Sequence, residues 1–239
     1  MVAVLPEPPL LVPELATGAS AGVRQLRAAV ADAAARLAGA ARRWIAVGSD
    51  PGGRRTVGPQ ARGSFRGFGV DVEVALGPAS GGAADPCFPL PLLIAGWAAA
   101  GTGAAVSVRG ELLPPDAPGP DCAALGAAIA AECASDAEQV GLLVIGDGAA
   151  VGVGRAPGFV GLRDGAAGFD AVVVAALAAA DAAALADLDA GLAASLHATG
   201  RAPWQVLAAV TGPGWRGELL YSAAPHGATY HVAVWTPGT

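Results

Sequence analysis

The fold class is decided by the first fifty residues, which read MVAVLPEPPL LVPELATGAS AGVRQLRAAV ADAAARLAGA ARRWIAVGSD (residues 1–50). Residues 2–5 and 44–47 are short apolar runs, and each predicts a buried β-strand. Residues 21–41 between them carry apolar side chains at helical spacing, which predicts an amphipathic helix. A strand, a helix and a strand in this order make a β-α-β unit, so we expect a sheet covered by helices.

The same alternation continues to the C-terminus. Further strands are predicted within 70–76 and at 105–109, 140–145, 218–221 and 229–235, and further helices at 90–100, 122–133, 169–196 and 202–210. We expect a break near Asp181 in the long helical stretch, and a long loop over residues 50–66, which have no apolar period. The chain therefore predicts an α/β fold, with residues 1–239 forming a single domain, an α/β/α sandwich around a central mixed sheet.

Composition excludes several functions. The chain has 60 Ala and no Lys, so all 14 basic residues are Arg, and neither a lysine Schiff base nor a P-loop lysine is available. The net charge is −6 and the arginines are scattered, which argues against nucleic acid as a partner. Three cysteines without a C-x-x-C spacing, and no secretory leader, predict a cytoplasmic protein.

One segment is long enough to cross a bilayer. Residues 86–108 contain no charged side chain. Three prolines interrupt the start of this run and three glycines dilute the rest, so a buried helix followed by a buried strand explains it better. We therefore expect no membrane partner.

Two glycine-containing motifs resemble known functional loops. Residues 18–22 match the G-x-S-x-G pattern of a hydrolase nucleophile, but no strand precedes them, so Ser20 is predicted to cap the helix that follows. Residues 146–152 resemble a dinucleotide-binding loop, but Asp147 lies inside it and no helix follows at once. We expect neither a serine nucleophile at the first motif nor a dinucleotide at the second.

The three histidines form no H-x-x-x-H pair. His197 lies near the predicted end of a helix, where a cation interacts favourably with the helix dipole. His226 and His231 are five residues apart, so on a regular strand they face opposite sides and at most one of them reaches a given pocket.

Acidic residues follow three of the predicted strands. Glu7, Asp50 and Asp147 each come within two residues or so of a strand end. Ligands of open α/β sheets bind at the carboxyl ends of the strands, which makes these acids candidates for a site. Acids are also common in solvated turns, and for each residue taken alone that explanation stays open.

Four segments in order resemble one family: PEPPLLVPEL at 6–15, GSD at 48–50, GDGAA at 146–150 and APWQVL at 202–207. Together they resemble the class III extradiol dioxygenase superfamily, which includes the protocatechuate 4,5-dioxygenase catalytic subunit and the Memo proteins, and actinobacterial members look most similar. The resemblance covers nearly the whole chain. It implies an α/β sandwich with a pocket at the strand ends.

The chain departs from the family at each iron-site position. In active relatives a P-H-P-P motif supplies an Fe(II)-binding histidine, where this chain has Glu7, and a second such histidine follows the second strand, where this chain has Asp50. The family's acid/base histidine aligns near Ala150, and the C-terminal ligand falls near Ala223 or Ala224. The resemblance therefore implies no cofactor of the standard Fe(II) type, and ordinary ring cleavage is not expected.

We expect a vestigial active-site pocket that binds a small molecule or peptide and is lined by Glu7, Asp50, Asp147 and His226. Two alternatives stay open. One is an active oxidoreductase with a rearranged metal site made by Glu7, Asp50 and His226. The other is a Memo-like interaction protein that uses the arginine-bearing loop 50–66, and a homo-oligomer is compatible with each hypothesis.

Overall fold

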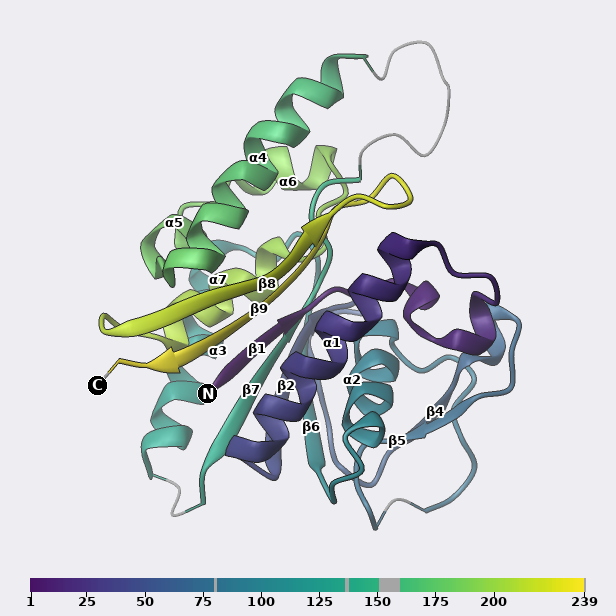
Figure 1. The fold of residues 1–239 in the computed structure, drawn as a ribbon. Helices are drawn as coiled ribbons and strands as arrows, with labels where there is room; N and C mark the ends of the chain where they lie inside the picture. Colours follow the sequence, from purple (N-terminus) through teal and green to yellow (C-terminus); the bar gives the residue numbers. More distant parts are fainter. Residues whose placement is uncertain (80, 136–137, 151–159, 239) are drawn as a thin grey trace.

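The protein is described by a computed structural model that covers residues 1–79, 81–135, 138–150 and 160–238. A mixed sheet lies at its centre, with the strand order β3-β6-β2-β7-β1-β9-β8 (Figure 1). The strands of this sheet are β1 (Val2–Leu5), β2 (Arg43–Ser49), β3 (Arg55–Val57), β6 (Ser107–Leu113), β7 (Val140–Ile145), β8 (Trp215–Ala223) and β9 (Tyr230–Pro237). A small hairpin of β4 (Arg62–Ser64) and β5 (Glu73–Ala75) lies apart from it.

The middle of the sheet is parallel. β6, β2, β7 and β1 run in the same direction, and β7 lies between β2 and β1, so the first two strands of the chain are not neighbours. β3, β9 and β8 are added in antiparallel pairings at the two sides. As a result, the carboxyl ends of four strands and the start of β9 lie at one edge of the sheet.

Helices cover both faces of this sheet. They are α1 (Ala21–Ala40), α2 (Leu90–Gly101), α3 (Gly119–Ser135), α4 (Val160–Ala179), α5 (Ala182–Ala186), α6 (Ala190–Ser195) and α7 (Arg201–Val210). Ala3 and Leu5 of β1 face the core shared with α1 and α2, whereas Val2 and Val4 face the core shared with α3, α4 and α7. The alternation of side chains along the strand thus divides the interior into two layers, and the predicted α/β sandwich is confirmed (Figure 1).

Helix α1 begins where its sequence predicts. The Ser20 hydroxyl accepts a hydrogen bond from the Val23 backbone at 3.4 Å, so Ser20 is an N-cap. Leu26, Val30 and Leu37 are buried along one face of the helix. The predicted helix cap is therefore confirmed for the residue that resembled a hydrolase nucleophile.

Three predicted boundaries were wrong. Residues 50–66 contain β3 and β4. β3 forms because it makes hydrogen bonds with strand β6, and no local sequence pattern predicts this pairing. β6 runs on to Leu113 instead of ending at residue 109. The stretch 169–196 holds the end of α4, which begins upstream at Val160, and the whole of α5 and α6. The expected break in this stretch is confirmed, since Asp181 caps α5.

The uncharged stretch 86–108 forms α2 and the start of β6, as predicted from its prolines and glycines. The buried side chains of α2 include Leu92, Leu93 and Ile94, which pack in the core of the protein. In the part of the chain that the structure describes, no helix has both the length and the apolar character needed to span a membrane.

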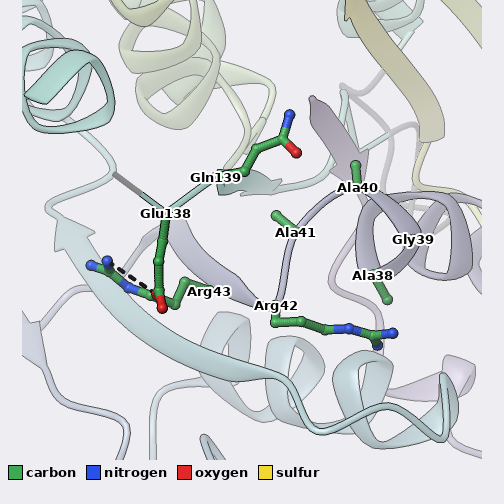
Figure 2. Close-up of a pocket in the computed structure, with 8 residues that line it drawn as sticks. All are labelled: Ala38, Gly39, Ala40, Ala41, Arg42, Arg43, Glu138 and Gln139. Carbon is green, nitrogen blue, oxygen red and sulfur yellow. Dashed lines mark ion pairs between the residues drawn. The ribbon is translucent and has the colours of Figure 1, made fainter. Parts of the chain in front are cut away.

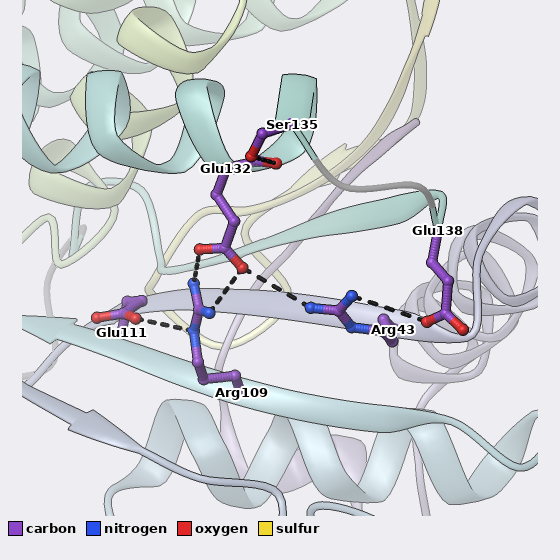
Figure 3. A network of polar contacts seen from close by, with 6 residues as sticks. All are labelled: Arg43, Arg109, Glu111, Glu132, Ser135 and Glu138. Carbon is purple, nitrogen blue, oxygen red and sulfur yellow. Dashed lines mark hydrogen bonds and ion pairs between the residues drawn. The ribbon is translucent and has the colours of Figure 1, made fainter.

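An ion-pair network ties α3 to the sheet (Figure 3). Arg109 of β6 makes two hydrogen bonds with the Glu132 carboxylate of α3, at 2.8 and 2.7 Å, and its Nε lies 3.0 Å from Glu111. Arg43 of β2 lies 3.8 Å from Glu132 and 3.7 Å from Glu138. Three acidic side chains, Glu111, Glu132 and Glu138, thus pair with the two arginines.

Candidate functional site

Two carboxyl groups meet at the strand ends. Glu7 follows β1 and Asp147 follows β7, and these strands are parallel neighbours. The Glu7 backbone N–H donates a hydrogen bond of 2.8 Å to Asp147 Oδ1. Glu7 is buried, with 6% of its surface exposed, and Asp147 is partly buried. Residues 140 positions apart in the chain thus form one cluster, which we call the Glu7–Asp147 pair.

The turn before α7 completes this cluster. The Thr199 hydroxyl accepts a hydrogen bond of 2.9 Å from the Asp147 backbone and donates one to the Glu7 carboxyl group. The Thr199 carbonyl accepts a hydrogen bond of 2.8 Å from the Ser49 hydroxyl at the end of β2. Thr199 therefore joins three strand ends, and the sequence analysis did not single it out because no local pattern marks it.

Gly146 permits this close approach. A Cβ atom on Gly146 would lie 2.4 Å from the Gly200 Cα atom, well inside the contact distance of two carbon atoms. The Gly200 backbone N–H donates to the Asp147 carbonyl at 2.9 Å. Glycine at this strand end thus allows the turn that carries Thr199 to pack directly against β7.

Burial changes the acidity of both carboxyl groups. Loss of solvation and, to a lesser extent, the nearby Asp147 charge raise the pKa of Glu7 to about 8, although the Thr199 hydrogen bond opposes both effects. Loss of solvation also raises the pKa of Asp147, to about 7, against the effect of the Glu7 backbone N–H. The pair therefore holds a proton near neutral pH. Glu7 Oε2 is buried and has no hydrogen-bond partner among the described residues.

Asp50 lies at the rim of the cluster. Its Oδ2 atom accepts hydrogen bonds from Arg55 at 2.7 Å and from the Gly52 backbone at 3.1 Å. Its charge contributes to the raised pKa of Glu7, but less than burial and Asp147 do. The structure thus brings all three predicted acids to one edge, with the Asp50 charge balanced by Arg55.

The predicted position of His226 beside the acids is corrected by the structure. His226 is exposed in the turn between β8 and β9, whereas His231 of β9 is fully buried at the same edge of the sheet. Among the described residues, no group of three or more histidine, cysteine or acidic side chains is arranged to hold a metal ion. The rearranged site of Glu7, Asp50 and His226 is therefore not formed.

A cavity of about 260 Å³ opens beside Thr199. It is lined by Pro115, Asp116, Ala193, Ala194, His197, Ala198 and Thr199. His197 follows α6 and has a φ of 52°, in the left-handed region that a non-glycine residue rarely adopts. Because Thr199 both lines this cavity and bonds to Glu7, a molecule in the cavity lies one side chain away from the pair.

A cavity at the opposite edge has a different character (Figure 2). It has a volume of about 270 Å³ and lies between the end of α1 and the starts of β2 and β7. Glu138 and Arg43, which line it, are paired with each other at 3.7 Å. The amino ends of parallel strands seldom carry the site of an α/β protein, so we assign the function to the other edge.

The arginine-bearing loop is largely neutralised. Arg55 pairs with Asp50, Arg62 with Glu73 and Arg66 with Asp71, each at 2.7 Å. These pairs fold the segment onto itself and onto the sheet edge. The loop therefore offers little unbalanced positive charge to an acidic partner.

The predicted dinucleotide-like loop extends to residue 152, and residues 151 and 152 lie outside the described part of the chain.

Comparison with known proteins gives a likeness in fold. No protein-family model matches the chain, and no curated protein matches it. Among solved structures, the chain is similar to the uncharacterized protein JW3007 from Escherichia coli K12, with a TM-score of 0.57 and 11% sequence identity. The match covers 98% of this chain and 98% of the other. At this identity the likeness extends to the fold alone.

Proposed function

We propose that this chain has a class III extradiol dioxygenase fold and that its strand-end site binds a small molecule in place of ferrous ion. The observation that carries the proposal is the Glu7–Asp147 pair, because Glu7 occupies the position for which the resemblance implies an iron-binding histidine. The mixed sheet with helices on both faces supports the proposal at the level of architecture.

The side chains at this edge do not fit an Fe(II) centre of the extradiol type. Such a centre uses two imidazoles and one carboxylate. Glu7 and Asp50 replace the imidazoles, and Asp50 is already bonded to Arg55. Ala223 and Ala224 stand where the resemblance places the third ligand, and a methyl group cannot bind iron. We therefore do not propose iron-dependent ring cleavage.

The ligand that fits is small and carries a hydrogen-bonding or cationic group. The cavity beside Thr199 holds about 260 Å³, near the lower end of the range for small-molecule sites. Its alanine and proline walls favour an apolar body, and Thr199, which bonds to Glu7, lies at one side. A protonated pair offers both a donor and an acceptor, and Glu7 Oε2 is free to accept a further hydrogen bond.

We place the protein in a reducing compartment, in keeping with the cytoplasm expected from its sequence. Among the described residues, Cys87, Cys122 and Cys133 form no disulfide, and Cys122 of α3 is buried. Burial raises the pKa of the Cys122 thiol, which keeps it protonated and unreactive.

The proposal is tested by ligand-observed NMR with a fragment library, on protein purified without chelator and assayed for bound metal. We expect fragments that bind the wild-type protein and lose about tenfold or more in affinity on Glu7→Gln or Thr199→Val, because each change alters the hydrogen-bonding groups of the buried cluster. The exposed Glu14 provides a matched control, because Glu14→Gln makes the same chemical change away from the site. Stoichiometric iron that is lost on Glu7→Gln, or fragment binding that neither site variant weakens, contradicts the proposal.

A further inference from the structure

A serine, a histidine and an aspartate lie in contact beside the carboxyl cluster. Ser222 of β8 and His231 of β9 are directly paired across the two strands, and the Ser222 Oγ atom lies 3.0 Å from His231 Nδ1. On the other side of the ring, His231 Nε2 lies 3.6 Å from Oδ1 of Asp170 in α4. None of these three side chains forms part of the Glu7–Asp147 pair.

The contacts select one tautomer of His231. A carboxylate only accepts hydrogen bonds, so the ring nitrogen that faces Asp170 is the one that carries hydrogen. Nδ1 then presents a lone pair to Ser222, whose hydroxyl group donates to it. This is the tautomer in which an imidazole can remove the proton of a serine nucleophile while a carboxylate orients the ring.

The surrounding structure holds the imidazole and the carboxylate in place. The Ala149 backbone N–H donates a hydrogen bond of 3.0 Å to Asp170 Oδ1. Gly148 packs over the contact between the two groups, since a Cβ atom there would lie 2.7 Å from both Asp170 Oδ1 and His231 Nε2. The Trp204 ring meets the imidazole edge-on, with centroids 5.9 Å apart.

The serine is exposed and its two partners are buried, as hydrolysis requires. Ser222 is exposed, whereas His231 is fully buried and Asp170 is 9% exposed. The hydroxyl group can therefore meet a substrate in solution, while the imidazole and the carboxylate interact with little competition from water. The contact of 3.6 Å is longer than a hydrogen bond, as is common in such sites before substrate binds.

We propose that Ser222, His231 and Asp170 form a catalytic triad that hydrolyses small carboxylic esters. In the first half-reaction, Ser222 Oγ bonds to the acyl carbon and its proton passes to His231 Nδ1, which then protonates the departing alkoxide as the ester C–O bond breaks. In the second, water attacks the acyl-serine, its proton passes through Nδ1 back to Ser222 Oγ, and the carboxylic acid leaves. No oxidant or cofactor enters this balance.

The position of Ser222 determines the substrate class. β8 is the outermost strand of the sheet, and Ser222 is exposed on it near the β8–β9 turn. Small acyl groups are therefore the expected substrates. Esters are expected rather than amides, because an alkoxide needs less help from the general acid to leave than an amine does.

The test measures p-nitrophenyl acetate hydrolysis over many turnovers, together with labelling by a fluorophosphonate probe located by mass spectrometry. We expect the probe on Ser222, and a loss of about 100-fold or more in kcat/KM for Ser222→Ala and for Asp170→Asn. Ser222 is exposed, so Ser222→Ala keeps the fold, which circular dichroism verifies. Ser195→Ala is the matched control, because Ser195 is also exposed and its hydroxyl group donates to the Leu192 carbonyl within its own helix.

Two results overturn this inference. One is turnover by Ser222→Ala at the wild-type rate, which assigns the hydrolysis to another group. The other is a wild-type protein that neither turns over the ester nor takes up the probe. Fragment binding, which tests the proposed ligand site, and ester turnover are measured separately on the same protein, and Ser195→Ala is expected to retain both, so the failure of one proposal is distinguishable from the failure of the other.

Discussion

The Glu7–Asp147 pair makes the stability of the protein depend on pH, and Glu7→Gln exposes this dependence. The folded pKa of Glu7, about 8, lies above its ordinary value of 4.5. A raised carboxyl pKa means that folding favours the protonated form. This contribution is fully present below pH 4.5 and is lost as the pH rises through about 8.

The magnitude follows from the size of the shift. Each pH unit between the two pKa values removes about 1.4 kcal/mol from the free energy of unfolding, and the whole shift corresponds to about 5 kcal/mol. Glutamine has nearly the same shape as protonated glutamate and stays neutral at every pH. We therefore expect Glu7→Gln to match the wild-type protein near pH 5 and to be more stable by several kcal/mol near pH 8.5.

Urea denaturation at half-unit steps from pH 5 to pH 8.5 measures this difference. The free energy of unfolding of the wild-type protein is expected to fall with pH more steeply than that of Glu7→Gln. Glu14→Gln, a change at an exposed position, is expected to run parallel to the wild-type curve. The reasoning is refuted if the free energies of unfolding of wild type and Glu7→Gln change with pH in parallel, or if the wild type becomes more stable relative to the variant as the pH rises.

Three further predictions concern stability. Gly146→Ala forces a Cβ atom against the turn at residue 200 and is expected to cost about 1–3 kcal/mol in urea denaturation, whereas Gly168→Ala, in helix α4 with open space around it, is expected to be neutral or stabilising. Arg109→Ala removes the ion pairs that hold α3 and is expected to cost about 1 kcal/mol, less in high salt, while Arg42→Ala, at an exposed position, leaves the melting temperature unchanged. Ser20→Ala removes the cap of α1 and is expected to cost about 1 kcal/mol, measured by thermal unfolding followed by circular dichroism.

Local patterns predicted the elements on which the site depends. The strands at 2–5 and 140–145 match β1 and β7 residue for residue, because a short apolar run is a signal contained within the run itself. The position of Glu7 and Asp147 at strand ends followed from the same signal. Their meeting at one edge required that β1 and β7 be parallel neighbours, which only the structure showed.

Local sequence patterns predicted neither strand β3 nor the burial of His231. β3 is formed by hydrogen bonds with β6, more than fifty residues further along the chain, and its own sequence is polar and short. The spacing of His226 and His231 indicated that at most one of them enters a given pocket, but it could not say which. That choice depends on where the β8–β9 turn begins, and the turn leaves His226 exposed while pairing places His231 in the core.

The sequence by itself determined the α/β class, the capped first helix, and the acids at the ends of the strands, because periodicity and capping act between residues that are close in the chain. Only the tertiary structure decided that Glu7 contacts Asp147, that Thr199 joins them, and that His231 lies between Ser222 and Asp170. Apart from the contact between Ser222 and His231, these contacts join residues more than fifty positions apart in the chain. Their geometry depends on strand order and on the packing of glycine backbones, and no single segment of the sequence predicts either of these.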